Sequence, residues 1–142
     1  MTQKWLVPID GSEIALHSVA WLAAHAAEYR DPPEIALINV QVTLPNDIGR
    51  FINANTIREF HLDAGMTALA AARDKLVAAG LKPELHVLVG DPASAITEFA
   101  DSHACSQILI GTRGHSGLAG TLLGSVAMKV VHLSSVPVLL IR

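Results

Sequence analysis

A glycine-rich stretch at residues 111–125 is the part of this sequence whose residue types and spacing point to chemistry. It reads Gly-Thr-Arg-Gly-His-Ser-Gly-Leu-Ala-Gly-Thr-Leu-Leu-Gly-Ser and lies between an apolar run and a helical pattern. Glycine lets the backbone adopt positive φ and approach a ligand with no side chain in between. A helix that begins near Ser125 would add unpaired N–H groups, which bind anions. The stretch therefore predicts a phosphate-binding site.

The elements that must position this stretch follow from hydrophobic patterning. Short, nearly continuous apolar runs predict five strands, at residues 4–9, 34–40, 85–89, 107–110 and 136–141. Apolar residues at helical spacing predict helices over residues 12–29 and 56–79, a short helix from Pro92, and a helix from Ser125. Residues 43–55 show no clear period and predict a surface loop.

Strands that alternate with helices predict an α/β fold, in which a doubly wound, five-stranded parallel sheet has helices on both faces. Such sheets bind ligands outside the carboxyl ends of the strands, at the point where the strand order reverses. We predict the strand order 3-2-1-4-5. In that order Asp10 and Gly111, which end the first and fourth strands, flank the crevice.

Composition restricts the classes of function. The chain has 142 residues, of which 51% are hydrophobic and 16% charged, and this predicts one compact domain over residues 1–142. The net charge is −3 and the ten Lys and Arg are scattered, so we expect no binding to nucleic acid. No apolar run approaches the roughly 20 residues that span a membrane, and no signal peptide is recognisable. These features predict a cytoplasmic protein.

Metal and nucleophile chemistry is not favoured. The seven histidines are dispersed, with no pair at the spacing that places two ligands on one helix face. His115 lies inside the glycine-rich stretch and is a candidate phosphate contact. Cys105 is the single cysteine, so no internal disulfide forms, and we expect it to be a packed residue.

The whole chain resembles the universal stress protein family, and the glycine spacing carries the resemblance. Gly111 and Gly114 are separated by two residues, and nine further residues precede Gly124-Ser125, which is similar to the signature of the ATP-binding branch of that family. Val7-Pro-Ile-Asp10-Gly-Ser12 and the terminal Val136-Pro-Val-Leu-Leu-Ile141 add to it. The resemblance implies a fold like that of the adenine nucleotide alpha hydrolases, and a bound adenine nucleotide, ATP or AMP.

The resemblance also implies a role for each matching residue. Asp10 would accept hydrogen bonds from ribose hydroxyls, and Val40 would pack on adenine. The phosphates would lie among backbone groups of the glycine-rich stretch and the start of the following helix, with Mg²⁺ or Mn²⁺ on the phosphate oxygens. The implied binding residues are Pro8, Ile9, Asp10, Val40, Gly111, Arg113, Gly114, Gly124, Ser125 and Val126.

Alternatives remain for several of these residues. Asp10 before Gly11-Ser12 is also typical of an Asx turn or a helix cap. Ala127 stands where some ATP-binding members have a hydroxyl residue, which removes one phosphate contact. No Gly-Lys-Ser or Gly-Lys-Thr is present, so the pattern is not a P-loop.

We expect a stress-related sensor or regulator with at most slow ATP hydrolysis. The resemblance further implies a homodimer, paired through the last strand, and a protein partner that it leaves undefined. The alternatives are a member that forms an interaction dimer without nucleotide, and a true ATPase.

Overall fold

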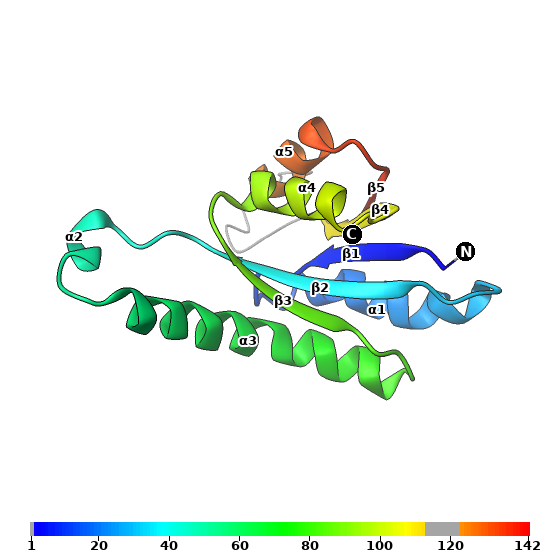
Figure 1. Ribbon diagram of the computed structural model, residues 1–142. Coiled ribbons are helices and arrows are strands. Elements are labelled where there is room, and N and C mark those ends of the chain that lie inside the picture. The colour runs from blue at the N-terminus through cyan, green and yellow to red at the C-terminus, as the bar shows by residue number, and fades with distance from the viewer. Residues whose placement is uncertain (1, 113–122) are drawn as a thin grey trace.

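The fold is built on a five-stranded, all-parallel sheet, seen in a computed structural model that describes residues 2–112 and 123–142. The strand order is β3-β2-β1-β4-β5, as predicted. The strands are β1 (Lys4–Pro8), β2 (Glu34–Gln41), β3 (Glu84–Val89), β4 (Gln107–Gly111) and β5 (Val138–Ile141) (Figure 1). All carboxyl ends therefore meet at one edge of the sheet, and β1 and β4 are neighbours there.

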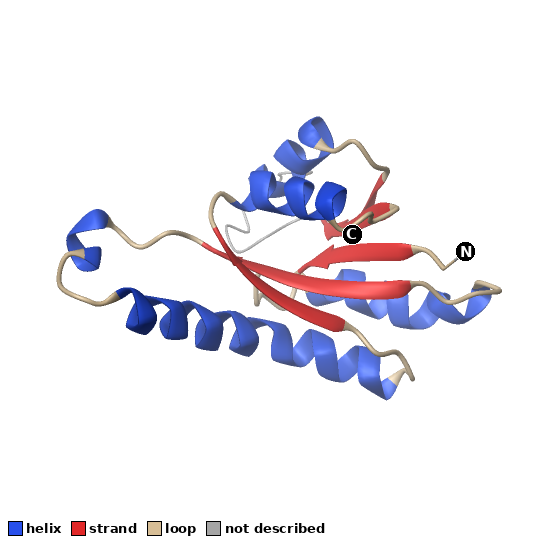
Figure 2. Cartoon of the chain, in the orientation of Figure 1, coloured by secondary structure: helices blue, strands red, loops and turns tan. Residues whose placement is uncertain are grey.

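Helices cover both faces of this sheet (Figure 2). α1 (Leu16–His25) and α3 (Ala54–Ala78) pack on one face. α4 (Pro92–Ser102) and α5 (Ser125–Leu133) lie on the other. Residues of β1 alternate between two buried cores, with Trp5 and Val7 in the first and Leu6 in the second. The predicted doubly wound architecture is confirmed.

The first helix is shorter than residues 12–29. α1 starts only at Leu16 and is followed by a 3₁₀ turn, η1 (Ala26–Glu28). The delay has a local cause, because Asp10 Oδ1 accepts hydrogen bonds from the N–H and the hydroxyl of Ser12, at 2.9 and 2.6 Å. Ser12 Oγ in turn accepts from the Ala15 N–H at 3.1 Å. These side chains stabilise a turn where the pattern predicted helix.

The predicted loop at 43–55 is not free of structure. It contains the short helix α2 (Asn46–Gly49), which lies beyond the end of the sheet in Figure 1. α3 begins at Ala54, two residues before its predicted start, because the Asn53 side chain accepts a hydrogen bond from the Thr56 N–H. Asn53 is therefore the N-cap of α3.

The predicted start of the short helix at Pro92 is confirmed, and the helix predicted to end at residue 79 ends at Ala78. Asp91 caps α4 by accepting from the Ser94 N–H, and Pro92 is the first helical residue. Gly80, at φ +84°, follows the end of α3, where the Leu81 N–H bonds to the Leu76 carbonyl. The end of α3 at Gly80 and the start of α4 at Asp91 therefore determine where the chain enters and leaves β3.

Within the described residues, no helix combines the length and apolar character needed to cross a membrane.

Candidate functional site

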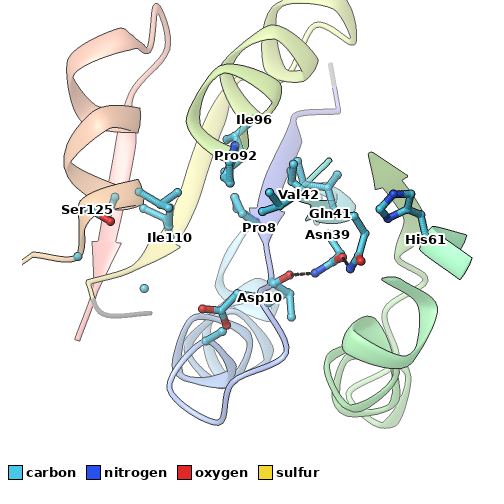
Figure 3. Close-up of a pocket in the computed structure, with 18 of the residues that line it drawn as sticks. Pro8, Asp10, Asn39, Gln41, Val42, His61, Pro92, Ile96, Ile110 and Ser125 are labelled. Atoms are coloured by element: carbon cyan, nitrogen blue, oxygen red, sulfur yellow. Dashed lines mark hydrogen bonds between the residues drawn. The ribbon is translucent and has the colours of Figure 1, made fainter. Parts of the chain in front are cut away.

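A pocket of about 590 Å³ lies at the carboxyl ends of β1, β2 and β4. This volume falls in the range of small-molecule sites. It occupies the position at which doubly wound sheets bind ligands, since the chain leaves β1 and β4 for helices on opposite faces. Figure 3 shows its lining side chains converging from β1, β2, β4, α3, α4 and α5.

The structure brings together every predicted binding residue that it describes. These pocket-lining residues are Pro8, Ile9, Asp10, Val40, Gly111, Gly124, Ser125 and Val126. Arg113 and Gly114, like His115, lie outside the described residues. Positions far apart in the sequence therefore share one pocket, which is the arrangement that a ligand-binding role requires.

The amino end of α5 forms one end of this pocket. The Gly124 N–H donates to the Thr112 carbonyl, so the two ends of the glycine-rich stretch lie side by side. The first bond within the helix runs from the Met128 N–H to the Gly124 carbonyl at 2.9 Å. The preceding N–H groups, those of residues 125–127, have no acceptor one turn earlier in the helix. This end of the pocket can therefore bind an anion.

Asp10 lies on the pocket wall at the end of β1. Its carboxylate holds the Asp10–Ser12 turn described above, so the turn role expected for an Asp before Gly-Ser is present. A carboxylate has several lone pairs and can accept more hydrogen bonds than these. The turn role and a ribose contact are thus compatible.

Sequence reasoning missed three polar side chains at the other end of the pocket. Asn39 and Gln41 lie on the last residues of β2, and His61 lies on α3. Asn39 is buried and its Nδ2 donates to the Ile9 carbonyl at 2.8 Å. The signal was available, because an amide interrupts a strand that is otherwise apolar on both faces.

His61 was missed because the buried face of α3 was assigned one residue off at its start. Leu62 and Met66 are among the apolar residues whose helical spacing predicted the helix over residues 56–79, and that spacing points to them as the inner face, but Leu62 is 51% exposed. The buried residues are His61, Gly65, Leu69, Ala72 and Leu76. The hydrophobic pattern did not reveal this buried face, because a histidine and a glycine occupy two of its positions. The pocket is also lined by apolar side chains that were not predicted as binding residues, namely Val42, Leu44, Phe60, Pro92, Ile96 and Ile110.

Other candidate groups do not converge on the pocket. Cys105 is buried and forms no disulfide, and burial raises the pKa of its thiol, which favours the packed role expected for it. In the described part of the chain, no three His, Cys, Asp or Glu side chains are grouped so that they could hold a metal ion.

Comparison with known proteins places the chain in a family. The sequence profile of the Universal stress protein family matches residues 1–142. The chain belongs to the universal stress protein family. It is 33% identical over 150 residues to Universal stress protein YxiE of Bacillus subtilis (strain 168), and the match covers 100% of both chains.

Solved structures agree with this family assignment. Hypothetical protein MJ0577 superposes with a TM-score of 0.83 and 25% identity, over 99% of this chain and 96% of that one. The crystal structure of a universal stress protein in complex with cAMP superposes with a TM-score of 0.73 and 27% identity, over 99% of this chain and 97% of that one.

Proposed function

We propose that this universal stress protein binds an adenine nucleotide, ATP or AMP, across the carboxyl ends of β2, β1 and β4. The observation that carries the proposal is the pocket itself. It joins the end of β1, with Asp10, to the amino end of α5, at the position where the strand order reverses.

The order of groups across the sheet gives the direction of the ligand. The phosphates lie at Gly111, Gly124 and the first N–H groups of α5, with the backbone of the glycine-rich stretch, including Arg113 and Gly114, around them. The ribose lies at Asp10 on the central strand, beside Pro8 and Ile9. The base lies beyond it, against Val40. The N–H groups at the start of α5 at one end, and the apolar side chains of Val40 and Phe60 in the wall at the other end, support this direction.

A relative supports the ligand class, since the universal stress protein that is 27% identical to this chain was crystallised in complex with cAMP. Mg²⁺ or Mn²⁺ would be carried by phosphate oxygens. We expect the bound state to be the output, in a stress-related sensor or regulator of the cytoplasm that hydrolyses ATP at most slowly. We expect it to act through a protein partner.

Binding can be tested on the purified protein. Nucleotide released by denaturation is separated by ion exchange, and ATP, AMP and cAMP are titrated by calorimetry. Asp10→Ala should weaken binding about 10- to 100-fold, since hydrogen bonds to a charged group contribute about 1.5–3 kcal/mol. Asp10→Asn keeps an acceptor for the turn and separates loss of the turn from loss of charge.

Asp31→Ala is the matched control, because Asp31 is exposed and precedes the amino end of β2. It should leave the affinity unchanged. Absence of released nucleotide together with no heat on titration would refute nucleotide binding, and would favour the alternative of an interaction dimer without ligand.

We also propose that two copies pair through β5. This strand is at one edge of the sheet, and Leu140 on it is 38% exposed. An exposed apolar edge strand is normally covered by another element or chain. Antiparallel pairing of two β5 strands would cover it with isologous contacts. Leu140→Glu should shift the protein from dimer to monomer in sedimentation, whereas Val77→Glu, at an exposed position of α3, should not. A wild-type monomer at micromolar concentration would contradict the pairing.

A further inference from the structure

A second pocket, of about 690 Å³, lies beside the first, between α2, the first two turns of α3 and the end of β3. The two pockets have only Leu44 and His61 in common among the described residues. The described residues assigned above to nucleotide binding line the first pocket and not the second. The second pocket is therefore a separate space with its own set of side chains.

One face of α3 forms a wall of this second pocket. Ala54, Ile57, Arg58 and His61 all line it. Their spacing of three or four residues places them on one side of the helix. The wall runs from the amino end of a 25-residue helix, which carries the positive end of the helix dipole, to the buried His61. A ligand on this wall would meet positive charge at its outer end.

Two arginines from different segments line the same pocket. Arg50 directly follows α2, and Arg58 lies on α3. Neither forms an ion pair with any residue that the structure describes. Asp47 and Glu59 are close to them in sequence but do not line the pocket, and no other described carboxylate does. Because a guanidinium is always charged and its planar fork matches carboxylate and phosphate, the pocket can bind an oxyanion.

His61 gives independent evidence for a ligand. Its side chain is 5% exposed and lines both pockets. Its Nδ1 is buried, and neither ring nitrogen has a hydrogen-bond partner within residues 2–112 and 123–142. Figure 3 shows the ring across the first pocket from Ser125, away from the helix start that would hold nucleotide phosphate. A buried polar atom without a partner is costly, so the ring indicates a partner that is not part of the protein.

The rest of the lining restricts the kind of anion. Leu44, Ile57 and Val89 contribute apolar walls, which favour a carbon skeleton over a bare ion. The two guanidinium groups balance two negative charges. A dicarboxylate or a phosphate monoester carries about this charge at neutral pH.

We infer that the second pocket is a binding site for a small organic dianion, a dicarboxylate or a phosphate monoester. Its oxyanion groups lie at Arg50 and Arg58, near the amino end of α3. Its body extends along the apolar wall and gives His61 a hydrogen-bond partner. The site goes beyond the proposed nucleotide binding and does not depend on it.

Calorimetry at low salt tests the site with succinate and phenyl phosphate, neither of which contains adenine. At least one should bind with a Kd of about 1 mM or tighter, and the tighter of the two identifies the class of acid group. Inorganic phosphate should bind about 10-fold more weakly, because it has no apolar body. Equal binding of inorganic phosphate, or no binding of either organic probe, would overturn the inference.

Arg50→Gln and Arg58→Gln should each weaken the bound probe about 3- to 10-fold, since both side chains are exposed and solvent screens their charges. Arg30→Gln is the matched control, because Arg30 is exposed, lines neither pocket and precedes the amino end of β2. The melting temperature should stay the same in all three variants. An equal loss of affinity in Arg30→Gln would show that only the net charge matters.

Backbone NMR locates the probe. Amide shifts on titration should fall within residues 43–61 and at Val89. Shifts confined to residues 123–127 would place the anion at the start of α5 and overturn the second site. His61→Phe keeps a ring without nitrogens, so it should weaken the probe about 3- to 10-fold without lowering the melting temperature of the free protein. Unchanged affinity in His61→Phe would refute the contact with His61.

Discussion

Gly65 on α3 lies so close to Val87 on β3 that a Cβ atom at position 65 would be 2.4 Å from Val87 Cγ1 and 2.5 Å from Cγ2. Real Cβ contacts are essentially never so short. The glycine therefore sets the distance between α3 and the sheet. One turn earlier on the same face is His61, so this contact also determines how far His61 and Phe60 enter the pocket.

Gly65→Ala should lower the free energy of unfolding by about 1–3 kcal/mol, even though Ala is the better helix former by about 1 kcal/mol. Val87 is β-branched and cannot rotate its methyl groups away easily. In the Gly65→Ala/Val87→Ala double variant the two losses should be less than additive, because the second change removes the clash. Urea denaturation of the four proteins measures this coupling.

Gly49→Ala is the control, since nothing lies within 4 Å of a Cβ built at that position. It should change the stability by less than about 0.5 kcal/mol. Fully additive losses for Gly65 and Val87 would contradict the close contact.

Asn39 should contribute to the stability of the fold. It is buried and connects the ends of β1 and β2 through the Ile9 carbonyl. Asn39→Leu leaves this carbonyl without its side-chain partner, so we expect a loss of about 1–3 kcal/mol in urea denaturation. Asn55→Leu, at an exposed position of α3, should stay within about 0.5 kcal/mol of the wild type. Equal losses of stability in the two variants would show that the buried hydrogen bond is not the cause.

The sheet was largely predictable from sequence, because strands that are buried on both faces have nearly continuous apolar runs. Helix ends such as those at Asp91 and Gly80 are predictable for a different reason, because a cap depends only on residues that are close in sequence. The strand order 3-2-1-4-5, predicted with the doubly wound α/β pattern, placed Asp10 and Gly111 at one crevice. These are the parts of the site that depend on strand ends alone.

What sequence did not reveal depends on contacts between distant residues. The bond from Asn39 to Ile9 spans thirty positions, and no periodicity encodes it. The late start of α1 reflects competition between the side chains of Asp10 and Ser12 and the helical backbone. His61 was missed because its place on the buried face depends on the close packing of Gly65 against β3.

Ala104 is a site where a single substitution should stabilise the protein. It has φ +53° and follows the end of α4, where the Cys105 N–H bonds to the Ala100 carbonyl. Alanine in this left-handed conformation costs about 1–2 kcal/mol, whereas glycine adopts it freely but loses about 0.5–1 kcal/mol of chain entropy. Ala104→Gly should therefore raise the free energy of unfolding by about 0.5–1 kcal/mol.

The corresponding position after α3 already has a glycine, Gly80 at φ +84°. Gly80→Ala should have the opposite effect. Ala79→Gly is the control, because Ala79 has φ −85° and gains nothing from glycine. A stability gain in Ala79→Gly equal to that in Ala104→Gly would show that the backbone conformation is not the reason.

Asp91 should make the stability depend on pH in the acid range. The Ser94 N–H that bonds its carboxylate, together with the Ser94 side chain, holds the pKa of Asp91 below its usual value. Its contribution is complete above the unfolded-state pKa of about 3.9. It is lost as the pH falls through the lower folded-state pKa, because the native state then takes up the proton.

Asp91→Ala should lower the melting temperature at pH 7, and the difference from the wild type should shrink at the acid end of a pH series. Asp91→Asn keeps an acceptor for the Ser94 N–H without the charge, so its melting temperature should follow the pH more weakly than that of the wild type. A constant difference between Asp91→Ala and the wild type down to the lowest pH would mean that the charge of this cap does not stabilise the start of α4 beside the pocket.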